Sequence, residues 1–155
     1  MRSIRSPLSC FELPEEKKMS DVKKHSKTLD TIALLRRLEK PKGRVDVILD
    51  TDTYNEIDDQ FALSYMLRSP EKLNVKAIYA APFHNEKSDG PADGMEKSYQ
   101  EILSILELAG RAELKQEVYR GSIRYLPDEE TPVDSPAAAN LAERAMEYTP
   151  DRPLY

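Results

Sequence analysis

The chain has 155 residues, a length that suits one ordinary domain. Hydrophobic residues make up 39% and charged residues 33%, so the chain is polar for a globular protein but still able to form a core. The net charge of −5 argues against nucleic acid as a partner, because phosphate contacts require a basic surface. Cys10 is the single cysteine, which excludes an intrachain disulfide and a cysteine-based zinc site.

The charge is distributed unevenly along the chain. Residues 1–43 carry 11 Lys and Arg against 6 Asp and Glu, whereas residues 44–155 carry 12 against 22. We interpret residues 1–27 as a basic, disordered arm and residues 28–155 as the folded part. No apolar run approaches the roughly 18 residues that a membrane span needs, and the first residues lack the apolar segment of a signal peptide. We therefore expect no membrane partner and a cytoplasmic location.

Hydrophobic spacing predicts an alternating order of helices and strands. The helices are expected at about residues 28–40, 58–68, 94–109 and 136–148. The strands are expected at about residues 45–49, 75–81 and 117–120. This order predicts an α/β fold, an open Rossmann-like parallel sheet with flanking helices and right-handed crossovers. Ser135 followed by Pro136 is typical of an N-cap and the first residue of a helix.

The last residues, 153–155, are typical of the opening of a further strand. We therefore expect a sheet truncated to about three to four strands, the N-terminal portion of a larger domain. The edges of so small a parallel sheet would be apolar and unpaired. Such edges favour a homo-oligomer or a complementing C-terminal half as partner.

Between the first predicted strand and the next helix lies a turn that is unusually acidic. Five acidic side chains fall within ten residues: Asp50, Asp52, Glu56, Asp58 and Asp59. So much like charge in one turn is unfavourable unless a cation binds there. Carboxylate oxygens are the ligands that hard divalent cations prefer, and open α/β sheets bind ligands at the carboxyl ends of their strands. The turn therefore predicts a cation site.

Simpler interpretations of the acidic turn explain only part of it. In a solvated loop, Asp58 and Asp59 would favour the positive end of the helix and Asn55 would favour the turn, but Asp50 and Asp52 would have no role. An EF-hand is excluded, because the sixth position from Asp50 is not glycine and the twelfth is not glutamate.

A phosphatase of the haloacid dehalogenase type is a closer alternative. Its strand is followed by two aspartates two residues apart, as Asp50 and Asp52 are. The fifth position of that pattern is Thr or Val, whereas Tyr54 stands here. The pattern also gives no role to the pair Asp58-Asp59.

The turn as a whole resembles the nucleoside hydrolase family of the inosine–uridine-preferring type. That family has a strand followed by Asp-x-Asp-x-x-x-Asp-Asp. The corresponding residues are Asp50, Asp52, Asp58 and Asp59, with two extra residues between the second and the third. An Asn after the second strand, at position 85, and the segments 118–121 and 135–138 also resemble the family. The resemblance covers about residues 45–155.

The resemblance implies a hydrolase of nucleoside salvage, which cleaves the N-glycosidic bond of ribonucleosides with the help of Ca²⁺. Asp52 would be a calcium ligand and the general base, and Asp59 a second ligand. Asp58 and Asn85 would bind ribose hydroxyls, and Asp50 would shape the turn. Because of the two extra residues, Glu56 is an alternative ligand.

Family members take further calcium ligands and the leaving-group contacts from a later part of their chains. We regard His84 as a loop histidine rather than the acid that protonates the leaving base. Two carboxylates fall well short of the 6–8 oxygens of a calcium shell. We therefore expect this chain alone to bind calcium weakly and to be nearly inactive. The alternative is an inactive remnant, or an interaction module with the same fold.

Overall fold

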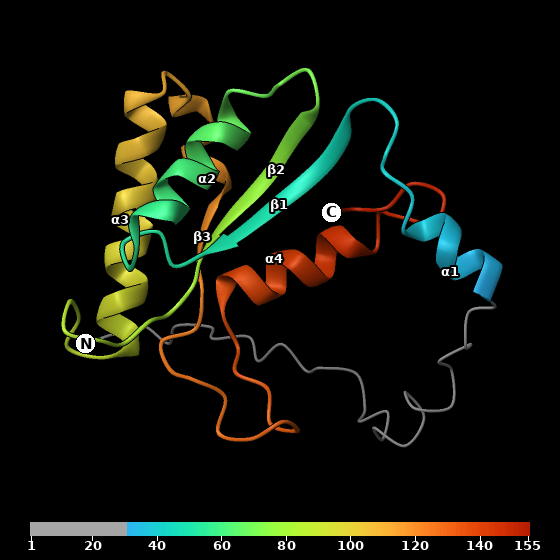
Figure 1. Cartoon of the computed structure of the whole chain (residues 1–155). Helices are drawn as coiled ribbons and strands as arrows, with labels where there is room; N and C mark the ends of the chain where they lie inside the picture. Colours follow the sequence, from blue (N-terminus) through green and yellow to red (C-terminus); the bar gives the residue numbers. More distant parts are fainter. Residues whose placement is uncertain (1–30) are drawn as a thin grey trace, which may run out of the picture. The chain divides into compact units, whose positions relative to one another are not determined.

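The computed structural model describes residues 31–155 (Figure 1). The chain divides into two compact units, of which the second is Pro41–Tyr155. In the first unit, helix α1 spans Thr31–Arg37 and is shorter than predicted. The predicted start of this helix and the predicted arm at residues 1–27 lie outside the described residues.

The second unit alternates strands and helices in the predicted order. Its elements are β1 (Val45–Thr51), α2 (Ile57–Leu67), β2 (Leu73–Ala80), α3 (Pro91–Leu108), the 3-10 helix η2 (Ala112–Glu117), β3 (Val118–Arg120) and α4 (Pro136–Ala145). The strands form one parallel sheet in the order β1-β2-β3. This arrangement confirms the prediction of an open α/β sheet with flanking helices.

Two helices differ from the prediction at their ends. Helix α3 begins at Pro91 rather than near residue 94, because proline suits the first turn of a helix and Gly90 before it adopts a φ of 150°. Helix α4 is capped as predicted, since the Ser135 hydroxyl accepts a hydrogen bond of 3.1 Å from the Ala138 amide. It ends at Ala145, before the predicted end.

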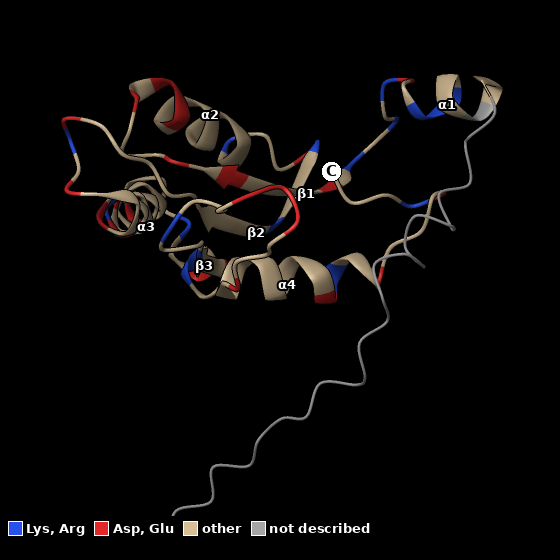
Figure 2. Cartoon of the chain, turned by 90° about the horizontal axis from the view of Figure 1, so that it is seen from below, with Lys and Arg blue, Asp and Glu red and all other residues tan. Residues whose placement is uncertain are grey.

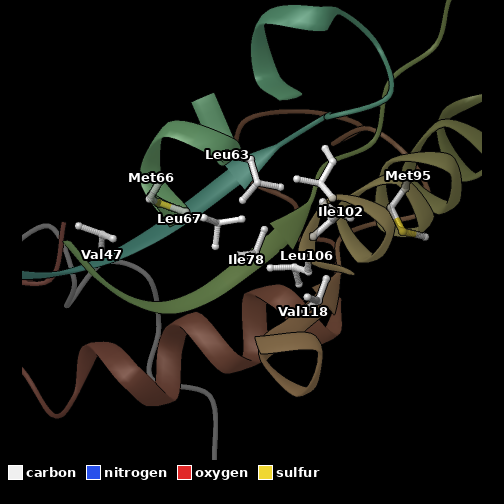
Figure 3. Packing of buried hydrophobic residues seen from close by; sticks show 11 residues of the cluster. Val47, Leu63, Met66, Leu67, Ile78, Met95, Ile102, Leu106 and Val118 are labelled. Atoms are coloured by element: carbon white, nitrogen blue, oxygen red, sulfur yellow. The ribbon is translucent and has the colours of Figure 1, made fainter. Parts of the chain in front are cut away.

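The core lies between the sheet and the helices α2 and α3 (Figure 3). It is formed by Val47, Leu63, Met66, Leu67, Ile78, Ala80, Met95, Ile102, Ile105, Leu106 and Val118. Among these residues, Leu63, Ile102 and Leu106 are completely buried. Each such side chain stabilises the fold by about 1.5–3 kcal/mol relative to an exposed one.

Helix α4 covers the opposite face of the sheet, as Figure 2 shows. Its Ala137 packs in a small cluster with Ala77 and Tyr79 of β2. The hydroxyl of Tyr79 donates a 2.9 Å hydrogen bond to Asn140 of α4. The sheet is therefore covered on both faces, as parallel sheets require.

The free edge of β1 is partly paired by the last residue. The amide of Tyr155 donates to the carbonyl of Asp46 at 3.0 Å, and the carbonyl of Tyr155 accepts from the amide of Ile48 at 2.7 Å. One residue bonded to two positions two apart on its neighbour is the pattern of a parallel ladder. Within residues 31–155, no helix is long and apolar enough to cross a membrane.

Asp46 joins three elements at the start of β1. Its carboxylate accepts hydrogen bonds from the side-chain amide of Asn74 in β2 and, at 2.9 Å, from the hydroxyl of Tyr148. The bond from Asn74 is the main cause that lowers the pKa of Asp46, followed by the bond from Tyr148, while burial opposes both. The ionised carboxylate therefore ties β2 and the segment after α4 to β1.

We predict that Asp46→Ala lowers the free energy of unfolding at neutral pH by about 1–2 kcal/mol, because two hydrogen bonds to a charged group are lost. The pKa of Asp46 is lower in the fold than its ordinary 3.8, so its stabilisation is present above that pH and is lost as the pH falls through the folded value. Urea unfolding at neutral pH and at about pH 2 measures this. The exposed Asp134→Ala is the control. An equal loss at both pH values would contradict the role of the carboxylate.

Candidate functional site at the carboxyl end of the first strand

Two buried threonines fix the start of the acidic turn. Thr51 is 4% and Thr53 0% exposed, and their hydroxyl oxygens lie 2.9 Å apart. Side chains alternate in direction along an extended chain, so the inward threonines leave Asp50 and Asp52 on the outer side. The alternating sequence Asp-Thr-Asp-Thr thus combines two buried threonines with an exposed Asp50 and a half-buried Asp52.

The middle of the turn is attached to α3. The amide of Tyr54 donates to the hydroxyl of Ser98 at 3.4 Å, and Ser98 is completely buried. The amide of Asn55 donates to the carbonyl of Asp52 at 2.6 Å and closes the turn. The backbone that carries Asp52 is therefore held from the inside by α3 and by its own turn.

Helix α2 brings a second carboxylate to Asp52. It begins at Ile57, so Asp58 and Asp59 lie in its first turn. The pKa of Asp59 is raised, first by burial and then by the adjacent Asp52 carboxylate, with a smaller contribution from Asp58; contact with Thr51 opposes these effects. Asp52 and Asp59, predicted as metal ligands, therefore lie side by side, while Asp58 is exposed.

The acids of the turn form no ion pair within the described residues, although the ammonium of Lys87 reaches the backbone of the turn at Asn55. None of the ion pairs within residues 31–155 includes an acid of positions 50–59. The side chain of Asp50 is exposed, yet partial desolvation and the Asp52 carboxylate raise its pKa. Figure 2 shows the resulting negative charge at the tip of β1 and the start of α2. This unbalanced charge favours a cation.

Asn85, predicted to bind ribose, lies at the same edge of the sheet. Its side-chain amide donates to the side-chain oxygen of Asn55 at 2.6 Å. The side-chain amide of Asn55 in turn donates to the Asp52 carboxylate at 2.9 Å. The loop after β2 is thus joined to the turn after β1 by one chain of hydrogen bonds.

A glycine of α3 allows the loop after β2 to approach. A side-chain carbon on Gly94 would lie 2.0 Å from the carbonyl oxygen of Phe83, so only glycine fits. The hydroxyl of Ser88 donates to the same carbonyl at 3.2 Å. The prediction that Gly94 starts the helix is wrong, because it lies inside α3, where it serves this contact.

His84 and Glu56, which were also considered from the sequence, lie at the periphery of the candidate site. His84 is exposed, and its Nδ1 lies 3.5 Å from the Ser88 hydroxyl. Glu56 is exposed at the N-cap position of α2 and makes no side-chain cap bond. Lys87 reaches the turn, since its ammonium donates to the carbonyl of Asn55.

The donor set fits a hard cation in kind and supplies part of its shell. Asp52 and Asp59 offer carboxylate oxygens, the ligands that Ca²⁺ prefers. Within the described residues, no group of three or more His, Cys, Asp or Glu side chains is close enough to hold a metal ion. The pair therefore provides fewer oxygens than the 6–8 of a full calcium shell.

Comparisons with known proteins identified no protein similar to this chain. No model of a protein family matches the chain, and searches of curated proteins and of solved structures found no match. The interpretation of the site therefore rests on its own residues and geometry.

Sequence reasoning missed the residues that hold the acids in place. It assigned no role to Thr51, Thr53 and Ser98, and it treated Asn55 only as a turn former. The alternation of threonine with aspartate indicates which side chains are buried. The partnership of Asn55 with Asn85 leaves no local signal, because 30 positions separate the two residues.

We predict that Asp59→Asn raises the thermal midpoint of the protein in EDTA at neutral pH. Because the pKa of Asp59 is raised above 3.8, its ionised form destabilises the metal-free fold at neutral pH, and this cost is absent below that pH. Thermal unfolding measures the effect. Glu56→Gln removes the same charge from the same turn away from Asp52, so we expect a smaller change. A lower midpoint for Asp59→Asn would contradict the placement of the two carboxylates.

We predict that Gly94→Ala lowers the free energy of unfolding by about 1–3 kcal/mol, because the added methyl group overlaps the carbonyl of Phe83. Urea unfolding measures the loss. Gly43→Ala is the control, since nothing lies within 4 Å of the added carbon there and only its φ of 84° opposes the change. An unchanged stability of Gly94→Ala would show that the loop does not rest on α3.

Proposed function

We propose that this chain carries the calcium- and ribose-binding turn of a nucleoside hydrolase, which cleaves the N-glycosidic bond of ribonucleosides to ribose and free base. The observation that carries the proposal is the convergence of three side chains at one edge of the sheet. Asp52 lies beside Asp59, and Asn85 is joined to Asp52 through Asn55. The proposal assigns these side chains the roles that the sequence resemblance implies.

Asp52 is the proposed general base. Its Oδ2 accepts the bond from Asn55, and its Oδ1 takes no part in that bond. A carboxylate in this position takes a proton from a water molecule that attacks the sugar. The neighbouring Asp59 adds a second negative charge, which a bound cation would balance.

Asp58 and Asn85 are the proposed ribose-binding residues. The carboxylate of Asp58 is exposed at the start of α2 and accepts hydrogen bonds from hydroxyl groups. Asn85 has a second amide hydrogen beside the one that bonds Asn55. This hydrogen is able to donate to a hydroxyl oxygen of the sugar. A calcium ion held by Asp52 and Asp59 would supply Lewis acidity toward water and orientation of the sugar diol.

The negative field of the turn suits the reaction. Cleavage of the bond between ribose and base passes through an oxocarbenium-like transition state with positive charge on the sugar. Fixed carboxylates near that charge stabilise the transition state more than the neutral ground state. An acidic turn whose carboxylates form no ion pair within the described residues therefore fits glycoside chemistry better than the binding of an anionic substrate.

We predict weak but measurable calcium binding to this chain, with a dissociation constant on the order of 1 mM, because two carboxylates supply only part of the shell. Isothermal titration with CaCl₂ measures it. Asp52→Asn and Asp59→Asn should each abolish the binding. Asp128→Asn, in an exposed loop that is also acidic, should leave it unchanged. Equal loss in all three variants would point to nonspecific charge and sink the proposal.

Ribose release from inosine and uridine, with calcium added, tests the reaction itself. We expect turnover far below the range of about 1–1000 s⁻¹ of ordinary enzymes, because the metal shell is incomplete. Any release that is measured should disappear in Asp52→Asn. Hydrolysis of p-nitrophenyl phosphate with Mg²⁺, without any ribose release, would favour the phosphatase alternative instead. Calcium binding without any hydrolysis would favour an inactive module.

A further inference from the structure

Asn55 lies at the centre of the hydrogen bonds that join the two loops of the site. Its backbone amide donates to the carbonyl of Asp52 at 2.6 Å, and its side-chain amide donates to the carboxylate of the same residue at 2.9 Å. Its side-chain oxygen accepts from Asn85 at 2.6 Å. Its carbonyl accepts from the ammonium of Lys87. No other residue of the turn, positions 50–59, makes side-chain hydrogen bonds to both Asp52 and the loop after β2.

The direction of each hydrogen bond is set by the donors and acceptors of the side chains. The NH₂ group of Asn55 donates to the carboxylate of Asp52, so the side-chain oxygen of Asn55 is turned away from Asp52. Asn85 must then turn its own NH₂ group toward that oxygen. The oxygen of Asn85 is left facing the backbone amide of Lys87, which donates to it at 2.9 Å. The orientation of the two asparagines is therefore set from both ends, by the carboxylate of Asp52 and by the backbone amide of Lys87.

This series of hydrogen bonds does not use every polar group of Asp52 and Asn85. On Asp52 the bond from Asn55 occupies Oδ2 and not Oδ1. On Asn85 the bond to Asn55 occupies one amide hydrogen and not the other. The groups outside these bonds are the base oxygen and the ribose donor of the proposed site. Their relative position depends on the side chain between them, Asn55, which is partly buried.

We propose that Asn55 is a positioning residue, which fixes Asp52 and Asn85 relative to each other so that cation and sugar bind in one arrangement. The inference rests on the proposed function for its purpose, but the link itself exists without any ligand. Asn55 is part of the stretch between Asp52 and Asp58 that is two residues longer than the family pattern. The longer turn thus gives the chain a bridge between its two loops.

The link is tested by the NMR signals of the side-chain amides in the metal-free full chain. In Asn55→Ala, the Asn85 amide loses its acceptor, and we expect its ¹⁵N-bound hydrogens to shift and to exchange faster with water. In Asn55→Asp, a carboxylate oxygen still accepts from Asn85, so the Asn85 signals should stay protected while the bond to Asp52 is lost. Unchanged Asn85 signals in Asn55→Ala would overturn the proposal.

Calcium titration tests the consequence of the link. We expect Asn55→Ala to weaken calcium binding about tenfold, as is typical when a residue that orients a metal ligand is removed. The matched control is Asn74→Ala, which removes the hydrogen bond from Asn74 to Asp46. That bond also joins an asparagine to an aspartate, but it lies at the opposite end of β1 from the acidic turn. Equal weakening by both variants would mean a general loss of structure and would contradict a positioning role.

The two proposals fail in different ways. If the wild-type chain shows the protected Asn85 amide but binds no calcium, the proposed function is wrong and the positioning role falls with it. If the wild-type chain binds calcium but Asn55→Ala binds it equally well, the positioning role alone is wrong. Thermal unfolding of each variant identifies those that fail to fold, and the Asn85 amide signals of Asn55→Asp, which preserves size and shape, then test the link.

Discussion

The parallel register of β1 and β2 is the constraint on which the candidate site depends. Thr51 pairs with Ala80, and the amide of Ala81 donates to the carbonyl of Thr51 at 2.9 Å, so both strands end at the same level. The turn after β1 and the loop after β2 must therefore emerge side by side. Asp52 and Asn85, which are 33 positions apart, meet at this edge only because the register is fixed.

The second constraint is electrostatic. The buried threonines direct Asp50 and Asp52 outward, and α2 begins where Asp59 reaches the same place. The raised pKa of Asp50 and Asp59 indicates that the fold pays a cost for this arrangement while no cation is bound. A site that is strained by its own charge is typical of function, because binding of the opposite charge relieves the strain.

The sequence predicted the order of the elements and the class of the fold, since hydrophobic periodicity reflects which faces are buried. The resemblance also implied that Asp52, Asp59 and Asn85 belong to one site, since Asp52 follows the first strand, Asp59 lies in the first turn of the next helix and Asn85 lies in the loop after the second strand. Helix ends were less predictable, as at Pro91, where the local geometry of proline decides. The bridge through Asn55 was not predictable, because it depends on the distance between two loops in space.

Paramagnetic relaxation by Mn²⁺ in NMR spectra tests most directly whether the acidic turn binds a divalent cation. At low occupancy, Mn²⁺ broadens the signals of nuclei close to its site before all others. The account predicts that the backbone amides of residues 51–59 and the side-chain amide of Asn85 broaden first, and that added Ca²⁺ restores them. First broadening at the exposed acidic loop 128–130, or equal broadening at both places, would contradict it.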